Sequence, residues 1–457
     1  MARKPSQLPG GVRLSDCLSL GVLMAKLPSE RVDQVLQATG RQSRRQRQLP
    51  ARLMVYYVIA LTLYMEISSE AVLSWLLEGL SWLGQSIPSQ WAGRAGLSQA
   101  RIRLGVEPLR QLYEQTVTPI ATAQTQGAWY RDFRLVSMDG TSLEVADTPD
   151  NEATFGRPGS GRGRSGFPQL RFVCLAESGT HVLFGAAIGG CRTSERQLAK
   201  RVVTWLQPQM LCLADRGFFG FALWQQAYQT GAQLLWRVSF QVCLPVVERL
   251  PDGSYLSKIY PRPYDRETDR RGVWVRVVDY RLQGVEGSEP KYRLLTTLLD
   301  PQQAPAVELA ALYQERWEIE LAFAELKTQL RGRRVVLRSK GPELVLQELY
   351  GLLLAHYVVR QLLHEAAGHA GRDPDELSFV HAVRVLRRKL PKLVASPPCA
   401  VAIASISAPR RDRVGAGQFQ SGAPQPSRRE EEAQFLSDPP TSPGILSPEN
   451  RLPSRDP

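Results

Sequence analysis

The stretch Leu135-Val-Ser-Met-Asp-Gly-Thr-Ser-Leu-Glu-Val145 places Asp139 inside a run of residues that favours a β-strand. Six more element patterns follow it, namely strands at 169–177, 181–188, 210–214 and 233–238, and helices at 194–206 and 219–230. The resulting order, β-β-β-α-β-α-β, is that of ribonuclease H. We therefore predict an α/β fold with a ribonuclease-H-like catalytic core.

Two further acidic residues stand at comparable places in the pattern. Asp215 ends the fourth strand, Leu-Cys-Leu-Ala-Asp, and Glu320 lies in a long helical pattern at 304–330. Because the first and fourth strands are adjacent in a fold of this order, Asp139 and Asp215 are expected to converge. The stretch between Asp215 and Glu320 includes β-rich, charged sequence at 241–299, which leaves room for an insertion. Taken singly, each aspartate is also typical of a turn or a strand end.

Three carboxylates are the ligand set that the hard cation Mg²⁺ prefers. A pair of such ions, about 3.5–4 Å apart, accelerates phosphodiester cleavage by activating the attacking oxygen and stabilising the leaving oxygen. The pattern thus predicts that Asp139, Asp215 and Glu320 hold a two-metal Mg²⁺ site, with Mn²⁺ as the alternative ion.

The helix around Glu320 carries a second signal. Tyr313, Arg316, Glu320 and Lys327 fall within about 60° of one another at 100° per residue, and an apolar stripe for docking on the sheet lies beside them. Such a helix holds one carboxylate over a metal site and turns two cations and a phenol towards phosphate oxygens. The competing interpretation of the spacing is a solvated, salt-bridged helix face.

Composition favours a nucleic-acid partner. The 457 residues include 57 Lys and Arg against 44 Asp and Glu, a net charge of +13. Most of the cations are Arg, whose planar guanidinium pairs with phosphate in two-pronged fashion, so DNA ranks above an anionic membrane. The longest apolar run, 53–65, is shorter than the roughly 20 residues that span a bilayer. No signal peptide is evident, and we expect a cytoplasmic, nucleoid-associated protein.

Cysteine and histidine spacing predicts no zinc site. The six Cys include no C-x-x-C pair and are typical of buried thiols in a reducing cytoplasm. The five His are too few and too C-terminal to suggest a metal cluster.

The combined motifs identify a family. The pattern Y-x-x-R-x-x-x-E-x-x-x-x-x-x-K from Tyr313 to Lys327, with Met-Asp-Gly-Thr and Ala-Asp-Arg-Gly-Phe upstream, resembles the DDE transposases of the insertion element 4 family. The N-terminal segments LPARLMVYYVIALTLY and LSQARIRLG, and the later segments FPQLR, YRLLTTLLDP and RSKGPELVLQELYGLLLAHYVVR, are similar to that family as well. The resemblance covers roughly residues 10–365.

The resemblance implies a function and roles for the residues. Asp139, Asp215 and Glu320 would be the catalytic, metal-binding triad of a transposase that binds terminal inverted repeats and performs cut-and-paste transposition. The residues that would bind the DNA end near its phosphates are Tyr313, Arg316 and Lys327. Tyr292 matches an aromatic residue on which relatives stack a base that is flipped out of the DNA helix. A buried core tyrosine is the competing interpretation of Tyr292.

Partners and alternatives follow from the same resemblance. The substrate would be double-stranded DNA, both transposon ends and target, and the enzyme would act as a homodimer because two ends are cut and joined together. The alternatives are a non-catalytic DNA-binding regulator derived from a transposase and a metal-dependent nuclease of the same fold.

The implied domains are a helical N-terminal DNA-binding domain and a core interrupted by the insertion. We expect the DNA-binding domain at 1–125, the first part of the core at 126–240, and the β-rich insertion at 241–300. The catalytic helix and the end of the core would follow at 301–370, and a basic helical segment with a disordered tail at 371–457.

Two weaker DNA contacts are also predicted. A Gly-rich run at 155–166 carries Arg157, Arg162 and Arg164, and is either a flexible arm that touches the DNA backbone or a plain hairpin loop. Arg216, directly after Asp215, either contacts a phosphate or pairs with a carboxylate.

Overall fold

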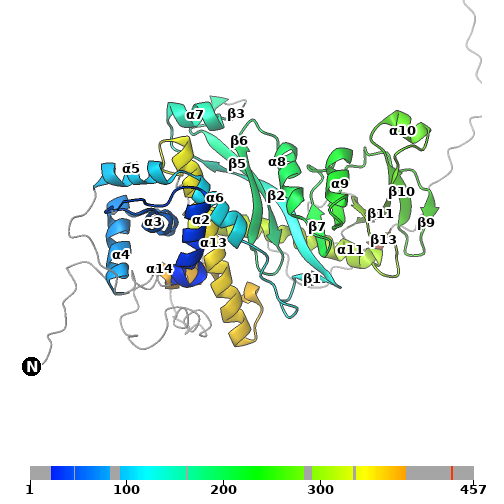
Figure 1. Ribbon diagram of the computed structural model, residues 1–457. Helices are drawn as coiled ribbons and strands as arrows, with labels where there is room; N and C mark the ends of the chain where they lie inside the picture. The colour runs from blue at the N-terminus through cyan, green and yellow to red at the C-terminus, as the bar shows by residue number, and fades with distance from the viewer. Residues whose placement is uncertain are drawn as a thin grey trace, which may run out of the picture.

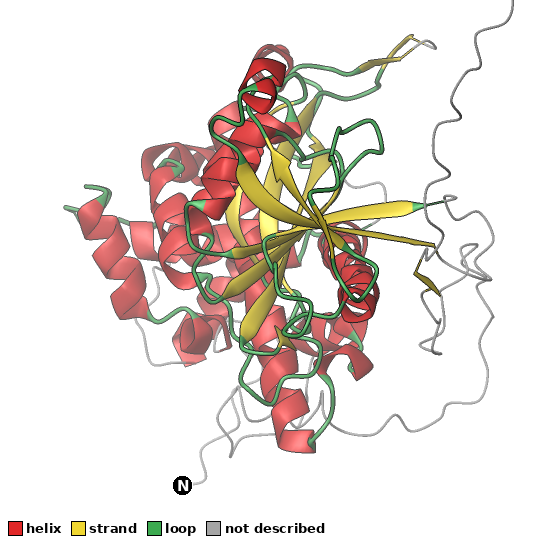
Figure 2. Cartoon of the chain, turned by 90° about the vertical axis from the view of Figure 1, so that its right-hand side faces the viewer, coloured by secondary structure: helices red, strands yellow, loops and turns green. Residues whose placement is uncertain are grey.

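One long, strongly twisted sheet runs through the computed structural model, which describes residues 22–45, 47–82, 93–160, 163–281, 291–332, 336–387 and 434–435 (Figures 1 and 2). The strand order along the sheet is β6-β5-β2-β7-β8-β12-β11-β10-β9. In that order the strands are Leu183–Gly190, Gln169–Glu177, Phe133–Glu144, Met210–Ala214, Gln233–Arg237, Tyr292–Thr296, Val273–Arg281, Tyr255–Ile259 and Glu248–Arg249. The short strands β1 (Trp129–Tyr130) and β13 (Gln434–Phe435) pair with β2 and β11, and β3 (Gly159–Ser160) forms a separate hairpin with β4 (Gly163–Arg164).

The first five strands have the ribonuclease-H-like arrangement. Strand β2 is antiparallel to β5, and β5 is antiparallel to β6. On its other side β2 is parallel to β7, and β7 is parallel to β8. This is the order that the strand pattern of the sequence predicts, with the first and fourth core strands as neighbours.

The β-rich segment after β8 continues the same sheet. Strand β12 pairs with β8 in antiparallel fashion, with Leu295 opposite Trp236, and β11, β10 and β9 follow outward from it. Figure 1 shows these strands at the end of the molecule opposite the N-terminal helices. The indole of Trp236 packs edge-on against Trp224, with ring centroids 5.2 Å apart, and both side chains are fully buried. The insertion therefore shares its core with the strands that carry the aspartates.

Helices cover the sheet and join it to the N-terminal region. Helix α8 (Glu195–Val202) packs on β5 and β6 and begins with a capping box formed by Ser194 and Gln197. The long helix α13 (Pro342–Ala370) packs on α3 (Ala51–Leu63) of the N-terminal region and on the π-helical segment η3 (Glu325–Leu330). The other helices are η1 (Val203–Trp205), α7 (Pro149–Phe155), α9 (Phe221–Tyr228), α10 (Pro263–Glu267), η4 (Pro374–Glu376) and α14 (Phe379–Arg387).

The N-terminal region consists of helices α2 (Ser29–Ala38), α3 (Ala51–Leu63), α4 (Ser69–Trp82), α5 (Arg94–Leu104) and α6 (Glu107–Thr116). The apolar run at 53–65 makes up most of α3, in which every residue except Arg52 is buried. Apolar residues at three- and four-residue spacing predict a single helix at 99–121, and that prediction is wrong. Gly105, with a φ of 69°, ends α5, and Pro108 lies in the first turn of α6, so the chain turns between them.

None of the helices that the structure describes is long and apolar enough to cross a membrane. The C-terminal tail predicted to be disordered lies outside the described residues, apart from 434–435.

A buried arginine connects the β-rich insertion to the start of helix α11 (Ala306–Leu312). Arg276 of β11 is fully buried; it donates hydrogen bonds to Ser254 Oγ at 2.8 Å and to the Ala304 carbonyl at 2.6 Å, and it pairs with Asp252. Asp252 in turn accepts a 2.9 Å hydrogen bond from the N–H of Ala306, the first residue of α11. Because each partner is buried or partly buried, losing one leaves the others without compensation.

Replacing Arg276 tests this anchor. Arg276→Met keeps most of the apolar part of the side chain but leaves Asp252 and the backbone carbonyl groups without their hydrogen-bond donor. We therefore expect the free energy of unfolding to fall by about 3–5 kcal/mol. Urea unfolding followed by tryptophan fluorescence measures it. The matched control is Arg281→Met, an exposed arginine on the same strand. Equal midpoints for the two variants would show that Arg276 holds nothing in place.

Candidate active site

Two aspartates lie side by side on neighbouring parallel strands. The register of β2 and β7 ends with Met138 opposite Ala214; Asp139 is the next residue of β2, and Asp215 directly follows the end of β7. Their side chains are 22% and 37% exposed, so both are accessible from the edge of the sheet. The structure thus brings together the two aspartates that the strand order predicts.

The third acidic residue lies on an interrupted helix. In place of one regular helix at 304–330, the chain forms α11 (Ala306–Leu312), the 3₁₀ segment η2 (Tyr313–Trp317), α12 (Glu318–Ala324) and the π-helical segment η3 (Glu325–Leu330). The predicted apolar stripe docks on the core, where Ile319, Ala322, Leu326 and Leu330 are all fully buried. Both 3₁₀ and π-helical turns within a helix are frequent at functional sites.

Arg316 bridges two of the predicted metal ligands. Its guanidinium lies 3.4 Å from Asp139 Oδ2 through one nitrogen and 3.0 Å from Glu320 Oε1 through the other. The Arg316 side chain is 10% exposed, so it compensates the two carboxylates in a largely desolvated place. Glu320, with 40% of its side chain exposed, faces the same edge of the sheet as Asp139.

Tyr313 and Lys327 hold the helix to the same two strands. The Tyr313 hydroxyl donates a 3.3 Å hydrogen bond to the carbonyl of Ala214, directly before Asp215, and the side chain is buried. Lys327 Nζ donates a 2.8 Å hydrogen bond to Thr141 Oγ1 on β2. Burial and the nearby Arg331 guanidinium lower the pKa of Lys327. In this arrangement both residues position the helix, and their contacts with DNA stay a prediction.

The surroundings of Asp139 disfavour its negative charge. Burial raises the pKa of Asp139 to about 6, and the carboxylates of Glu195 and Glu320 act in the same direction. The Gly140 N–H, which donates to Asp139 Oδ1 at 2.7 Å, and the Arg316 guanidinium oppose that rise. An acidic group whose charge is destabilised by its acidic neighbours is one that a bound cation would stabilise.

The donor set fits a hard divalent cation. The possible ligands are the carboxylate oxygens of Asp139, Asp215 and Glu320. The positively charged guanidinium of Arg316 already lies between the carboxylates of Asp139 and Glu320. Glu195, at the start of α8, is a further carboxylate near Asp139 that the sequence analysis missed. No spacing rule pointed to Glu195, because its proximity depends on how α8 packs across β5.

Arg237 connects the site to the predicted base-stacking residue. Its guanidinium lies 3.9 Å from Asp215 Oδ1, and it lies over the ring of Tyr292 with its central carbon 4.7 Å from the ring centroid. Tyr292 also stacks on Tyr280, with centroids 5.2 Å apart and an interplanar angle of 24°. Tyr292 is half-buried in this cluster rather than enclosed in the core. Arg237 was not anticipated, since it lies at the end of an ordinary buried strand pattern.

The two weaker predicted contacts lie in different settings. Arg157 binds within its own loop, where it donates to the carbonyls of Ser165 and Gly166 at 3.0 and 2.6 Å and pairs with Asp147 and Glu152. It therefore holds the hairpin in place in this structure. Arg216 is exposed in the turn after β7, and Arg162 lies outside the described residues.

Comparison with known proteins gives consistent matches. A family model described as "Insertion element 4 transposase N-terminal" matches residues 17–114, and one described as "Transposase DDE domain" matches residues 130–358, half of the chain. The chain is 29% identical over 380 residues to the transposase InsG for insertion sequence element IS4 of Escherichia coli (strain K12), which covers 81% of this chain and 83% of that protein. A solved piggyBac transposase synaptic complex with hairpin DNA aligns with 91% of this chain and 81% of that chain, at 12% identity and a TM-score of 0.36.

The raised pKa of Asp139 predicts how the charge affects stability. The pKa of Asp139 in the folded protein, about 6, lies above the ordinary value of 3.8. The folded protein therefore loses stability as the pH rises from about 4 to above 6 and Asp139 becomes charged. At pH 8 without divalent ions, Asp139→Asn should be more stable than the parent protein by roughly 1–3 kcal/mol. The gain lies at the low end of this range if the variant loses much stability with the ion pair to Arg316. Near pH 4 the difference should largely disappear.

Urea unfolding in chelator at the two pH values measures this difference. Asp132→Asn is the control, because Asp132 is exposed next to the same strand. A variant that is equally or less stable than the parent protein at pH 8 would contradict the explanation.

Proposed function

Because the chain belongs to the insertion element 4 family of DDE transposases and is a metal-dependent DNA-cleaving enzyme, we propose that it binds the terminal inverted repeats of its insertion sequence and moves that sequence by cut-and-paste. In this proposal the ion is Mg²⁺, and cleavage is followed by strand transfer. Two observations support it: the pairing of β2 with β7, which brings the backbone at Asp139 next to that at Asp215, and the Arg316 guanidinium, which joins Asp139 to Glu320.

The three carboxylates would hold the metal ions. Bound there, Mg²⁺ supplies charge stabilisation for an in-line displacement at a phosphodiester and lowers the pKa of bound water. The protein contributes the rigidity of the ligands: Asp139 and Asp215 are fixed by the pairing of β2 and β7, and Glu320 is fixed by a helix whose apolar stripe is buried. No covalent protein nucleophile is required, since water and the freed 3′-hydroxyl are the attacking groups.

The cations of the catalytic helix would bind the DNA end. Arg316 uses two of its nitrogens for Asp139 and Glu320, and a guanidinium has five N–H donors, so donors remain for a phosphate oxygen. Lys327, held by Thr141 on β2, lies on the same side of the helix. A phosphate at this place would also favour the charged form of Lys327, which burial disfavours.

The N-terminal helices offer a second basic surface for DNA. A cavity of ≈ 310 Å³ between the loop at 40–49 and helix α5 is lined by Arg41, Arg44, Arg47 and Arg103, with Leu49 and Met54 at its apolar base. Arginines grouped around a concave surface bind phosphates in two-pronged fashion. We assign this surface to sequence-independent contact with the DNA backbone, in keeping with a DNA-binding role for residues 1–125.

Tyr292 is proposed to stack with a base turned out of the helix. Stacking on an aromatic side chain stabilises a base by roughly 1–3 kcal/mol, which offsets part of the unstacking cost. The half-buried ring of Tyr292 already lies against Tyr280 and Arg237, so an incoming base competes with Arg237 for it. Arg237 also lies near Asp215. A base that displaces Arg237 from the Tyr292 ring would therefore change the surroundings of Asp215.

The working unit is proposed to be a homodimer on two DNA ends. Cut-and-paste requires that both ends of one element are cut and joined to one target, and two active sites serve two ends. Mixing a tagged with an untagged chain in the presence of inverted-repeat DNA tests this directly.

Removing a single carboxylate should separate cleavage from binding. We expect Asp215→Asn and Glu320→Gln each to lower the rate of Mg²⁺-dependent cleavage of terminal inverted repeats by at least about 100-fold, because each removes a metal ligand. Affinity for the same DNA in chelator should stay within a few-fold of the parent protein. Gel assays on end-labelled DNA measure both quantities.

The matched control is Glu308→Gln, an exposed acidic residue on α11 that pairs with Arg131 away from the site. If the parent protein with Mg²⁺ leaves its inverted repeats uncut while binding them, the chain is a DNA-binding regulator. If it cuts DNA without regard to the repeats and transfers no strand, it is a nuclease.

Lys327→Ala tests the phosphate contact. Loss of one phosphate-bound cation should weaken binding about equally for all DNA sequences and reduce the salt dependence of the affinity by about one unit of slope. Fluorescence anisotropy over a range of salt concentrations measures the slope. Lys340→Ala is the control, since Lys340 is an exposed lysine elsewhere in the chain. An unchanged slope for Lys327→Ala would assign Lys327 to helix positioning through Thr141 alone.

A further inference from the structure

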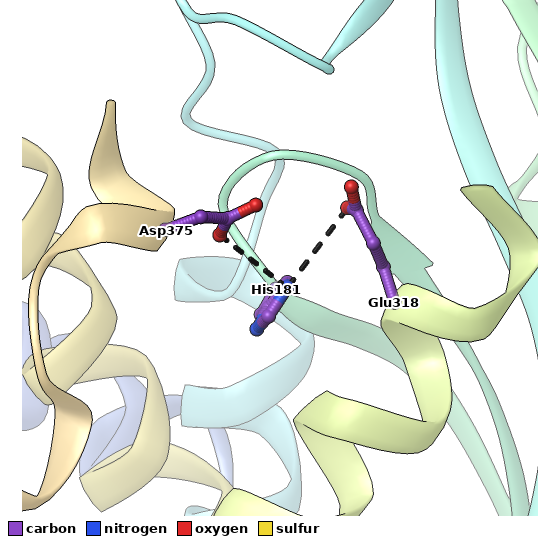
Figure 3. A group of neighbouring side chains, drawn as sticks. All are labelled: His181, Glu318 and Asp375. Carbon is purple, nitrogen blue, oxygen red and sulfur yellow. Dashed lines mark ion pairs between the residues drawn. The ribbon is translucent and has the colours of Figure 1, made fainter. Parts of the chain in front are cut away.

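A second group of metal-ligating side chains lies beneath the catalytic helix, separate from the carboxylates at the sheet edge. It consists of His181 from the turn between β5 and β6, Glu318 from the start of α12, and Asp375 from η4 (Figure 3). One ligand atom from each of these residues lies within 4.8 Å of the other two. Figure 3 shows the His181 ring between the two carboxylates.

We propose that His181, Glu318 and Asp375 bind a structural divalent metal ion, with Zn²⁺ preferred over Mg²⁺. His181 Nε2 lies 3.9 Å from Glu318 Oε2 and 3.6 Å from Asp375 Oδ1. This nitrogen is buried, has no hydrogen-bond partner among the described residues, and belongs to a residue that is only 4% exposed. A buried polar atom of this kind is normally paired, so its orientation towards two acidic side chains indicates a missing ligand.

The distances are close to those of a bound site. Metal bonds of 2.0–2.2 Å in a tetrahedron place neighbouring ligand atoms about 3.4 Å apart. The separations from His181 Nε2 to Glu318 and Asp375, 3.9 and 3.6 Å, exceed that value by a few tenths of an ångström, and the two carboxylate oxygens lie within 4.8 Å of each other. One imidazole and two carboxylates leave the fourth position to water, and imidazole favours Zn²⁺ over Mg²⁺.

A further carboxylate orients the imidazole. His181 Nδ1 lies 3.2 Å from Glu325 Oε1, so an N–H at Nδ1 donated to Glu325 leaves Nε2 with the lone pair that a metal needs. Arg360 also contacts Nδ1 and binds Glu325 through its Nε at 2.8 Å. If Arg360 donates to Nδ1 instead, the proton moves to Nε2 and the cluster is a metal-free hydrogen-bond network. The two arrangements differ in the histidine tautomer.

The charges favour the metal-bound arrangement. Glu318, Glu325 and Asp375 bring three carboxylates together against the single guanidinium of Arg360. A divalent cation would add positive charge to this acidic cluster beyond the single guanidinium of Arg360.

The backbone and the solvent access also suit a metal. His181 has a left-handed φ of 56°, which few residues other than glycine adopt, and strain of this kind persists where the surroundings fix a functional side chain. The adjacent Gly179 N–H donates to Glu318 Oε2 at 2.5 Å and so orients that carboxylate. Asp375 has 26% of its side chain exposed, which gives an ion a route from solvent.

A bound ion would join three distant parts of the chain. It would connect the β5–β6 turn, the catalytic helix and the segment after α13. Glu318 is two residues before Glu320. The ion would therefore fix the helix that carries Glu320 without contacting the DNA or the reacting groups.

Metal binding by the untagged full-length chain tests the proposal. The variant Asp139→Asn/Asp215→Asn/Glu320→Gln serves as the background, because it removes the ligands of the proposed catalytic site. After incubation with Zn²⁺ and desalting, elemental analysis should find one Zn²⁺ per chain, and Zn²⁺ should raise the Tm by a few degrees where Mg²⁺ does not. Co²⁺ in place of Zn²⁺ should give the visible absorption of a bound ion.

Single substitutions on this background localise the site. His181→Asn suits the left-handed backbone but lacks the imidazole, and Asp375→Asn changes a partly exposed residue, so both variants should fold. Each should lower Zn²⁺ affinity at least about 100-fold and abolish the Tm shift. Glu376→Gln, an exposed neighbour of Asp375 paired with Arg372, should bind as the background does.

Less than one tightly held Zn²⁺ per chain, or the same affinity in His181→Asn as in the background, would overturn the proposal. In that case nitrogen NMR of the His181 ring should find the proton on Nε2, as the hydrogen-bond network requires. Neither result bears on the proposed transposition, which is measured with Mg²⁺ on the parent protein.

Discussion

The guanidinium of Arg316 between Asp139 and Glu320 is the contact on which the proposed active site depends. A strand and a helix that both carry carboxylates repel each other unless positive charge lies between them. Arg316 supplies that charge from within the helix itself, so the packing of the helix on β2 does not depend on a bound metal ion. Tyr313 and Lys327 then fix the same helix to Ala214 and Thr141, on either side of the aspartates.

The helix that carries Arg316 has acidic side chains on two of its sides. Carboxylates lie on both of its sides: Glu320 towards the sheet edge, and Glu318 with Glu325 towards α13. On the first side Arg316 lies between Asp139 and Glu320, and on the second Arg360 pairs with Glu325. The second side also holds the imidazole of His181. This difference in ligands is why the two sides should prefer different metal ions.

Local sequence patterns could predict the order of the core strands and three of the acidic residues. The side chains that approach the site through tertiary packing could not be predicted in this way. The strand order and the neighbouring aspartates followed from short runs around Asp139 and Asp215, because adjacent parallel strands place equivalent positions side by side. The helix face from Tyr313 to Lys327 followed from periodicity, although the 3₁₀ and π-helical segments within it did not. Arg237 and Glu195 approach the site only through tertiary packing, so no spacing in the sequence indicated them.

The cluster around His181 depends on tertiary packing even more strongly. His181, Glu318 and Asp375 come from three elements far apart in the chain, so a search for closely spaced ligands could not find them. The expectation that the five histidines form no metal cluster rests on their small number and their C-terminal position. The structure instead places one of them, held in an unusual backbone conformation, against two carboxylates.

The continuity of the sheet from β8 into β12 constrains how this fold can change over evolutionary time. An insertion attached by flexible loops can be trimmed or exchanged with little effect on its host. Here, removing the segment from β9 to β12 would expose the hydrogen-bonding edge of β8 and uncover the apolar side chains around Trp236. An open edge next to the catalytic strands would invite pairing with other chains and aggregation. The segment is thus an integral part of the core, and its loss would disturb the fold more than changes in its distal loops.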